Sequence, residues 1–119
     1  MFSYVRAGHP DLILIRDGIG FQGNSTGDLP IGIEASVEFS KATIQLQKGD
    51  RIYFFTDGIT EANKYGSTKE QVKHLTQVLS DAYNLSLTES LDKVMDMVKE
   101  TSTGPSPHDD VTILGFEMR

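Results

Sequence analysis

Short apolar runs separated by polar turns dominate the first half of the chain and predict β-strands. Most side chains in residues 2–7 are apolar, with single polar residues between them. Residues 12–15 form an apolar run, which is followed by the turn dipeptide Asp17-Gly18. An Asp-Gly dipeptide after such a run is a strong hairpin signal, so residues 18–21 are the expected return strand. Because residues 2–7 begin as a strand without any lead-in, we expect them to belong to a sheet whose other strands come from elsewhere.

Two further strands are expected before the chain becomes helical. Residues 36–46 alternate in part between apolar and polar side chains, with a bend near residues 41–42. A turn at residues 48–50 follows. Residues 51–56 are different, because the run Ile-Tyr-Phe-Phe within them is apolar on both faces. This pattern predicts a central strand that is covered on both sides.

The second half of the chain carries helical spacing instead. Apolar residues recur every three or four positions in residues 68–83 and again in residues 87–98, which predicts two amphipathic helices. A loop rich in Ser, Thr, Gly and Pro is expected at residues 101–107. Residues 111–118 then alternate as a last strand. The chain therefore combines strands and helices in a single unit.

Composition narrows the class of protein. The 119 residues include 17 acidic and 11 basic side chains, a net charge of −6, and no cysteine. This length suits one domain, and an acidic chain without a basic cluster is not a typical nucleic-acid binder. The lack of cysteine excludes disulfides, thiolate zinc sites and cysteine nucleophiles. No stretch is apolar enough to span a membrane and the first residues do not form a signal peptide, so we expect a soluble cytoplasmic protein.

Two acidic positions lie where a sheet could hold a ligand. Asp57-Gly58 follows directly on the most apolar strand, and Asp109-Asp110 precedes the last strand. If these two strands are antiparallel neighbours, Asp57 and Asp109 meet at the same edge of the sheet. Clustered carboxylates repel one another unless a cation neutralises them, and oxygen ligands suit Mg²⁺ or Mn²⁺. Such ions activate water and stabilise charge on phosphoryl groups.

Simpler explanations exist for both positions. Asp57-Gly58 is also a common turn dipeptide, and Asp109-Asp110 could end a loop and solvate the start of a strand. From the residues alone, a divalent cation site and a pair of polar turns both remain open.

Four ordered motifs resemble one family, the bacterial phosphatases of the stage II sporulation protein E type. These enzymes belong to the metal-dependent protein phosphatases (PPM or type 2C). The strongest motif is Thr-Asp-Gly-Ile-Thr-Glu-Ala at residues 56–62. The others are Ala-Gly-His-Pro at residues 7–10, Leu-Pro-Ile-Gly-Ile at residues 29–33, and Asp-Asp-Val-Thr-Ile-Leu at residues 109–114.

The resemblance implies an α+β fold, an antiparallel β-sandwich flanked by helices. It implies a protein serine/threonine phosphatase in which two Mn²⁺ or Mg²⁺ ions activate a water that attacks the phosphate without a covalent phosphoenzyme. Asp57 and Asp109 match metal ligands of the family, with Gly58 and Asp110 in supporting positions. The implied substrate is a phosphorylated regulatory protein, such as an anti-sigma-factor antagonist, with no nucleic-acid or membrane partner.

The chain departs from the family in one large respect. The N-terminal half of the family's domain, which supplies a further metal-binding Asp, has no counterpart in these residues. We therefore expect residues 1–119 to be a single but partial phosphatase domain. The alternative is a phosphatase-derived interaction module that is inactive because that ligand is missing. A half-sandwich would leave apolar surface exposed, so a homodimer or strand exchange is a further expectation.

Overall fold

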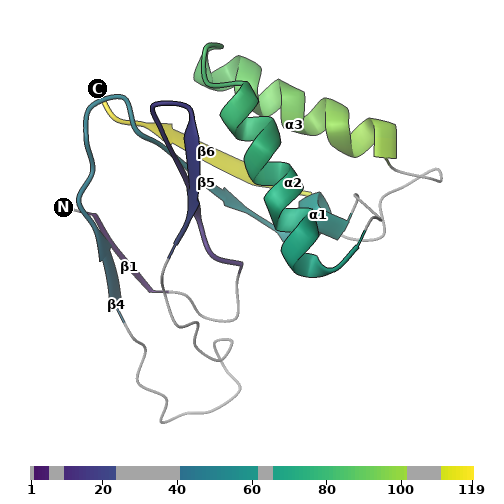
Figure 1. The fold of residues 1–119 in the computed structure, drawn as a ribbon, viewed down its shortest axis with the longest axis horizontal. Coiled ribbons are helices and arrows are strands. Elements are labelled where there is room, and N and C mark those ends of the chain that lie inside the picture. The colour runs from purple at the N-terminus through teal and green to yellow at the C-terminus, as the bar shows by residue number, and fades with distance from the viewer. Residues whose placement is uncertain (1, 6–9, 24–40, 62–65, 102–110) are drawn as a thin grey trace, which may run out of the picture.

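The structure is a computed structural model that describes residues 2–5, 10–23, 41–61, 66–101 and 111–119 (Figure 1). Five strands come first, followed by three helices and a last strand. The elements in chain order are β1 (Phe2–Val5), β2 (Ile13–Arg16), β3 (Ile19–Gln22), β4 (Lys41–Ile44), β5 (Arg51–Phe55), α1 (Asp57–Glu61), α2 (Thr68–Asp81), α3 (Leu87–Thr101) and β6 (Ile113–Glu117). None of these helices is long and apolar enough to cross a membrane.

The strands form two antiparallel sheets. The larger sheet has the order β3-β2-β5-β6, and the smaller one pairs β1 with β4. Strand β1 thus finds a partner within this chain. The condition that the apolar central strand and the last strand are antiparallel neighbours is met, because β5 pairs with β6 and Phe55 lies opposite Ile113.

The turn between β2 and β3 forms where the Asp-Gly dipeptide predicts it. Asp17 has φ 51° and Gly18 has φ 78°, and Arg16 and Ile19 close the hairpin around them. Two successive residues with positive φ are typical of the two-residue turns that match the twist of a hairpin.

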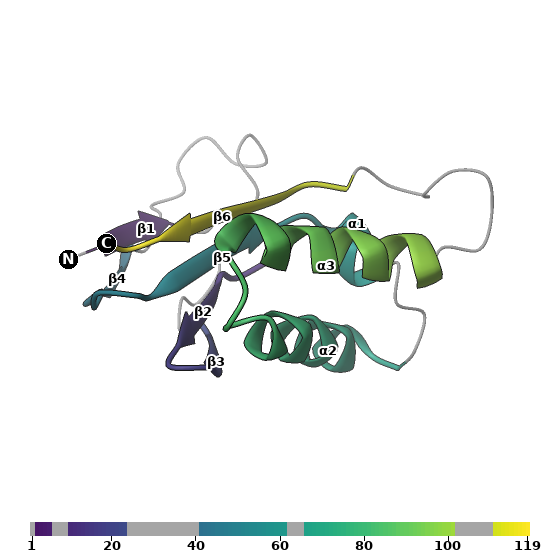
Figure 2. The ribbon, with the colours of Figure 1, turned by 90° about the horizontal axis from the view of Figure 1, so that it is seen from above.

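Strand β5 is buried on both faces, as its sequence predicts. Tyr53 and Phe55 belong to a cluster on the helix side of the sheet, and Ile52 belongs to a second cluster with β2 and the β1–β4 sheet. The helices α2 and α3 lie side by side along the same side of the larger sheet (Figure 2). The fully or nearly buried members of the helix-side cluster are Ile13, Ile15, Tyr53, Phe55, Ile59, Val72, Leu75, Leu79, Val94, Met97 and Val98.

A buried arginine joins the sheet to the turn between α2 and α3. Arg51 is 7% exposed, and its Nε donates to the Glu117 carboxylate at 2.7 Å. Its guanidinium also donates to the carbonyl oxygen of Leu85 at 2.5 Å and to that of Ala82, the C-cap residue of α2, at 3.4 Å. One side chain thus links strands β5 and β6 to the segment that joins the two helices.

Several expected boundaries change in the structure. The strand expected at residues 36–46 is described only as β4, since residues 24–40 lie outside the described residues. The helix expected at residues 68–83 ends at Asp81. The strand expected at residues 111–118 is shorter, because β6 covers residues 113–117. Helix α1 was not expected at all, since five residues are too few for a helical apolar period to be visible in a sequence.

Asp50 is a second buried charge, and it fixes the start of β5. The Arg16 guanidinium donates to both of its carboxylate oxygens, at 2.9 and 2.6 Å, and the Gln47 amide donates at 2.8 Å. The hydrogen bonds from Arg16 hold the pKa of the Asp50 carboxyl below its usual range. Because the pKa is lower in the folded state, the ionised carboxylate stabilises the fold above the unfolded pKa of about 4, and this contribution is lost as the pH falls through the folded pKa.

Replacing Asp50 should therefore destabilise the protein in a pH-dependent way. Asp50→Asn is expected to lower the free energy of unfolding by about 2 kcal/mol at pH 7, because it removes charge-assisted hydrogen bonds at a buried site. Urea denaturation should show that this difference from the wild type shrinks as the pH falls below about 4. The matched control Asp92→Asn, at an exposed position of α3, should change the stability by less than about 0.5 kcal/mol. An Asp50→Asn effect that stays constant between pH 7 and pH 3 would contradict this explanation.

Candidate metal site at the end of strand β5

Asp57 is the first residue of α1 and the second residue after the end of β5. Its side chain is exposed, whereas Ile59 is fully buried in the helix-side cluster and Thr60 is 3% exposed. The Thr60 hydroxyl donates to the Asp57 carbonyl at 3.1 Å, and the Ile59 amide donates to the Thr56 carbonyl at 3.0 Å. The buried side of α1 thus holds Asp57 in place at the surface.

Paired threonines connect this end of β5 to the start of the last strand. The Thr56 amide donates to the Thr112 carbonyl at 3.0 Å, and the Thr112 amide donates to the Thr56 hydroxyl at 2.9 Å. The register of β5 and β6 therefore continues one step beyond Phe55 and Ile113. Asp57 and Val111 are the next residues along these two segments, so the sheet edge that was expected to carry the acidic residues exists.

The structure describes two of the four expected site residues. Asp57 lies at the expected strand end, and Gly58 is buried beside it. Asp109 and Asp110 lie outside the described residues. Within the described part of the chain, no group of three or more acidic or histidine side chains gathers to hold a metal ion. The site is therefore described in part only, through Asp57 and its surroundings.

The chemistry of Asp57 fits a hard divalent cation. Its carboxylate forms no hydrogen bond or ion pair with any residue that the structure describes, and an exposed carboxylate oxygen is a ligand that Mn²⁺ and Mg²⁺ accept. One carboxylate does not by itself make a metal site, because a hard divalent cation needs several oxygen ligands.

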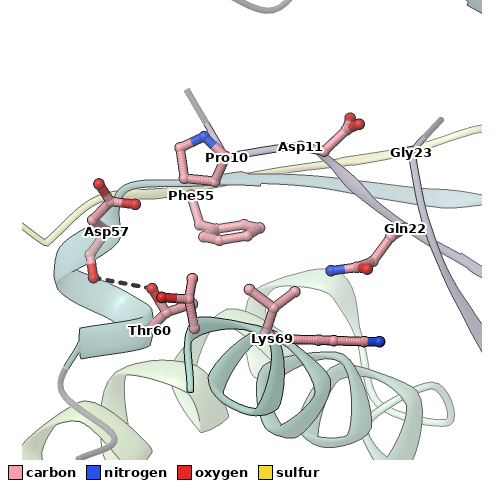
Figure 3. A pocket seen from close by; sticks show the side chains of 10 residues that line it. Pro10, Asp11, Gln22, Gly23, Phe55, Asp57, Thr60 and Lys69 are labelled. Carbon is pink, nitrogen blue, oxygen red and sulfur yellow. Dashed lines mark hydrogen bonds between the residues drawn. The ribbon is translucent and has the colours of Figure 1, made fainter. Parts of the chain in front are cut away.

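A pocket of about 500 Å³ opens beside Asp57. Figure 3 shows Asp57 and Asp11 at opposite sides of this pocket, with the Phe55 ring between them. Gln22 and Lys69 lie at the side away from Asp57, and the Lys69 side chain extends toward Gln22. The full lining is Pro10, Asp11, Gln22, Gly23, Phe55, Asp57, Thr60, Thr68, Lys69 and Val72. An apolar floor with a few polar groups around it is typical of ligand pockets.

Asp11 is held firmly on its side of the pocket. The Tyr4 hydroxyl and the Leu12 amide donate to its Oδ1 at 2.9 and 2.8 Å. Gly23 lies against the same atoms, since a Cβ there would come within 2.2 Å of the Asp11 Oδ1 and 2.4 Å of the Tyr4 hydroxyl. A larger residue here would have to displace the Asp11 or Tyr4 side chain, so glycine lets the chain pass close to the pocket without disturbing them.

Sequence reasoning missed Asp11, Gln22 and Lys69 as pocket residues. Asp11 comes just before an apolar strand, as Asp109 and Asp110 do, but it stands alone there. Lys69 lies on the polar side of α2, where a lysine is typical of any exposed helix face. Only the tertiary packing of α2 against the β2–β3 hairpin brings these side chains into one pocket with Asp57.

Comparisons with solved structures define the class of fold. The RsbU and RsbW domains of Rv1364c from Mycobacterium tuberculosis share 25% identity with this chain at a TM-score of 0.77, covering 99% of this chain and 32% of that one. The PP2C phosphatase domain with a fragment of the regulatory domain of SpoIIE from Bacillus subtilis has 23% identity and a TM-score of 0.73. This match covers 95% of this chain and 32% of that chain. The Mn-presoaked phosphatase domain of the same protein has 22% identity and a TM-score of 0.70, and this match covers 98% of this chain and 49% of that chain. The fold is thus part of a PP2C-type phosphatase fold.

The sequence profile of the Stage II sporulation protein E (SpoIIE) family matches residues 1–119. The chain therefore belongs to the SpoIIE family, as the four motifs indicated. It spans a third to a half of the length of the solved chains that it resembles. None of the curated proteins matches it.

The hydrogen bonds between Thr56 and Thr112 should stabilise the end of the β5–β6 pairing beside Asp57 against local opening. Thr56→Val removes the acceptor of the Thr112 amide while keeping the side-chain shape, so we expect a loss of about 1 kcal/mol in local stability. Amide hydrogen exchange at Thr112 should then be about fivefold faster. The control Thr43→Val, at an exposed position of β4, should leave this exchange rate unchanged. Unchanged protection of Thr112 in Thr56→Val would show that the hydroxyl does not hold the edge.

Proposed function

We propose that this chain is the C-terminal catalytic portion of a metal-dependent protein serine/threonine phosphatase. The observation that carries the proposal is an exposed carboxylate, Asp57, at the end of β5 in a chain that matches the SpoIIE family along its whole length. The likeness to an RsbU domain at 25% identity supports the same reading.

Asp57 and Asp109 are the proposed metal ligands, with Gly58 and Asp110 in supporting positions. Two Mn²⁺ or Mg²⁺ ions, when bound, supply an activated water and stabilise charge on the phosphorus. This chain would hold the Asp57 carboxylate at a rigid strand end and supply Asp109 from the segment before β6. The pocket beside it, with its Phe55 floor, has the size to admit a phosphorylated side chain.

The proposed substrate is phosphoserine or phosphothreonine on a regulatory protein of the anti-sigma-factor antagonist type. Two of the similar solved structures are a cell fate determinant and a protein with RsbU and RsbW domains. A role in signal transduction through sigma-factor regulation in the cytoplasm is the corresponding proposal for this chain. The acidic composition supports a protein substrate over nucleic acid.

An apolar sheet face supports the partial-domain proposal. Residues directly opposite in antiparallel strands share a face, so Phe21 lies on the same side as Leu14, and Phe116 on the same side as Ile52. This is the face opposite the helices. The large apolar side chains that stay exposed there are Ile19 (58%), Phe21 (47%), Leu114 (53%) and Phe116 (51%). We propose that the remaining part of the phosphatase domain covers them.

Substitution of Asp57 tests the metal-ligand role. In the full-length protein that contains this chain, Asp57→Asn should reduce Mn²⁺-dependent hydrolysis of a phosphoserine peptide by on the order of 100-fold, because the amide cannot replace an anionic ligand. The matched control Asp17→Asn, in the hairpin turn, should retain wild-type turnover. Full activity in Asp57→Asn would exclude the ligand role. A full-length wild type that hydrolyses no phosphopeptide with Mn²⁺ would favour the inactive interaction module instead.

The exposed apolar face leads to a separate expectation for residues 1–119 expressed alone. This chain should self-associate with rising concentration, because a second copy can cover the face that the rest of the domain leaves open. Light scattering should show that Leu114→Lys and Phe116→Lys together restore the monomer. Tyr83→Lys, at an exposed apolar residue in the turn after α2, should not. A monodisperse wild-type monomer at high concentration would contradict the partial-domain proposal.

A further inference from the structure

A second groove continues from the Asp57 pocket along α2. It has a volume of about 660 Å³ and runs between α2 and strand β3. Gln22 and Lys69 line both spaces, so the groove lies next to the pocket. Figure 3 shows the Lys69 side chain pointing away from Asp57, and the same residue lines the second groove. A ligand whose reacting group lies at Asp57 therefore has a path along α2.

Charge distinguishes this groove from the rest of the chain. Lys69 and Lys73 line it from successive turns of α2, together with Thr76, Gln77 and Ser80. No acidic side chain lines it among the described residues, although the whole chain has a net charge of −6. Both lysines are exposed and form no ion pair with any residue in the described ranges. The groove is thus a local positive strip on an acidic protein, which attracts acidic partners.

The opposite wall of the groove is a strand edge. Strand β3 lies at the end of the larger sheet and pairs only with β2 in the part of the chain that the structure describes. Arg16 and Ile19 close the hairpin, and the Gly23 amide donates to the Leu12 carbonyl at 2.9 Å. In this alternating pattern the backbone groups of Gly20 and Gln22 face the outer edge. An extended polypeptide can pair with such an edge.

Packing keeps the two walls at a fixed separation. The Ser80 hydroxyl donates to the Gly18 carbonyl, which fastens the far end of α2 to the hairpin turn. A Cβ on Gly20 would come within 2.3 Å of the Thr76 methyl group, so glycine permits the close approach of β3 to α2. The groove is therefore part of the folded scaffold rather than a surface crevice between loose elements.

We propose that the α2–β3 groove binds an extended, acidic segment of the phosphoprotein substrate, next to its phosphorylated residue. Lys69 and Lys73 contact acidic side chains of that segment, and the edge of β3 pairs with its backbone. This inference rests on the proposed phosphatase function and adds a specificity surface outside the metal site.

Binding of two peptides to the full-length protein tests the proposal without turnover, in buffer that contains EDTA. Both carry a fluorescein label and one phosphoserine, flanked on each side by two glutamates in the first peptide and by two glutamines in the second. Lys73→Glu should weaken binding of the glutamate peptide by about fivefold at low salt and change the glutamine peptide by less than about twofold. The difference in glutamate-peptide binding between the wild type and Lys73→Glu should become smaller as the salt concentration rises. The control Lys93→Glu, at an exposed position of α3, should change neither.

The outcomes separate this proposal from the proposed function. Equal affinity of the wild type for the two peptides, or equal effects of Lys73→Glu and Lys93→Glu, would overturn the groove proposal even if the protein is an active phosphatase. Preferential binding of the glutamate peptide in a protein that hydrolyses neither peptide with Mn²⁺ would support the groove and contradict the phosphatase. Hydrogen exchange of the Gly20 amide should slow when the glutamate peptide binds, and unchanged exchange would exclude the strand pairing.

Discussion

Burial of strand β5 on both faces is the constraint on which the rest of this structure depends. Tyr53 and Phe55 are 0% and 2% exposed on the helix side, and Ile52 is 3% exposed on the other. A strand of this kind cannot lie at a surface, so it requires a helical layer on one side and a second sheet on the other. The Tyr53 hydroxyl shares a 2.8 Å hydrogen bond with the Ser90 hydroxyl, which is also buried, and so ties α3 to the sheet.

The candidate site follows from the same constraint. A strand fixed on both faces ends at a defined point in space, and the next residue but one is Asp57. Helix α1 keeps that residue at the surface because Ile59 has to enter the core. The scaffold therefore provides rigidity, while the exposed carboxylate and the polar rim of the pocket provide the chemistry. This division is common where function is placed at the end of a rigid element.

The sequence predicted features that depend on local patterns. The hairpin at Asp17-Gly18, the doubly covered β5 and the two amphipathic helices all rest on periods or turn residues within a few positions. The start of α3 is a local feature of the same kind, since the Ser86 hydroxyl accepts from the Glu89 amide at 3.1 Å and these two residues have the spacing of a capping box. Family motifs added the antiparallel sandwich and the role expected for Asp57.

Features that depend on contacts between distant segments could not be predicted. The ion pair of Arg16 and Asp50 joins residues 34 positions apart, and no pattern in the sequence links them. The same is true of the pocket, where α2 brings Lys69 close to Gln22 and Asp57. These contacts arise when α2 packs on the hairpin, so only a tertiary structure reveals them. Helix α1 could not be predicted because its five residues are too few to show a helical apolar period. Its position depends on the burial of Ile59 in the core.

Anomalous X-ray diffraction at the manganese absorption edge, from crystals of the full-length protein grown with Mn²⁺, tests the central claim most directly. If Asp57 is a metal ligand, a manganese peak is expected within about 2.2 Å of one of its carboxylate oxygens, at the end of the sheet where β5 and β6 pair. A fully occupied manganese site elsewhere, with no peak near Asp57, would contradict it.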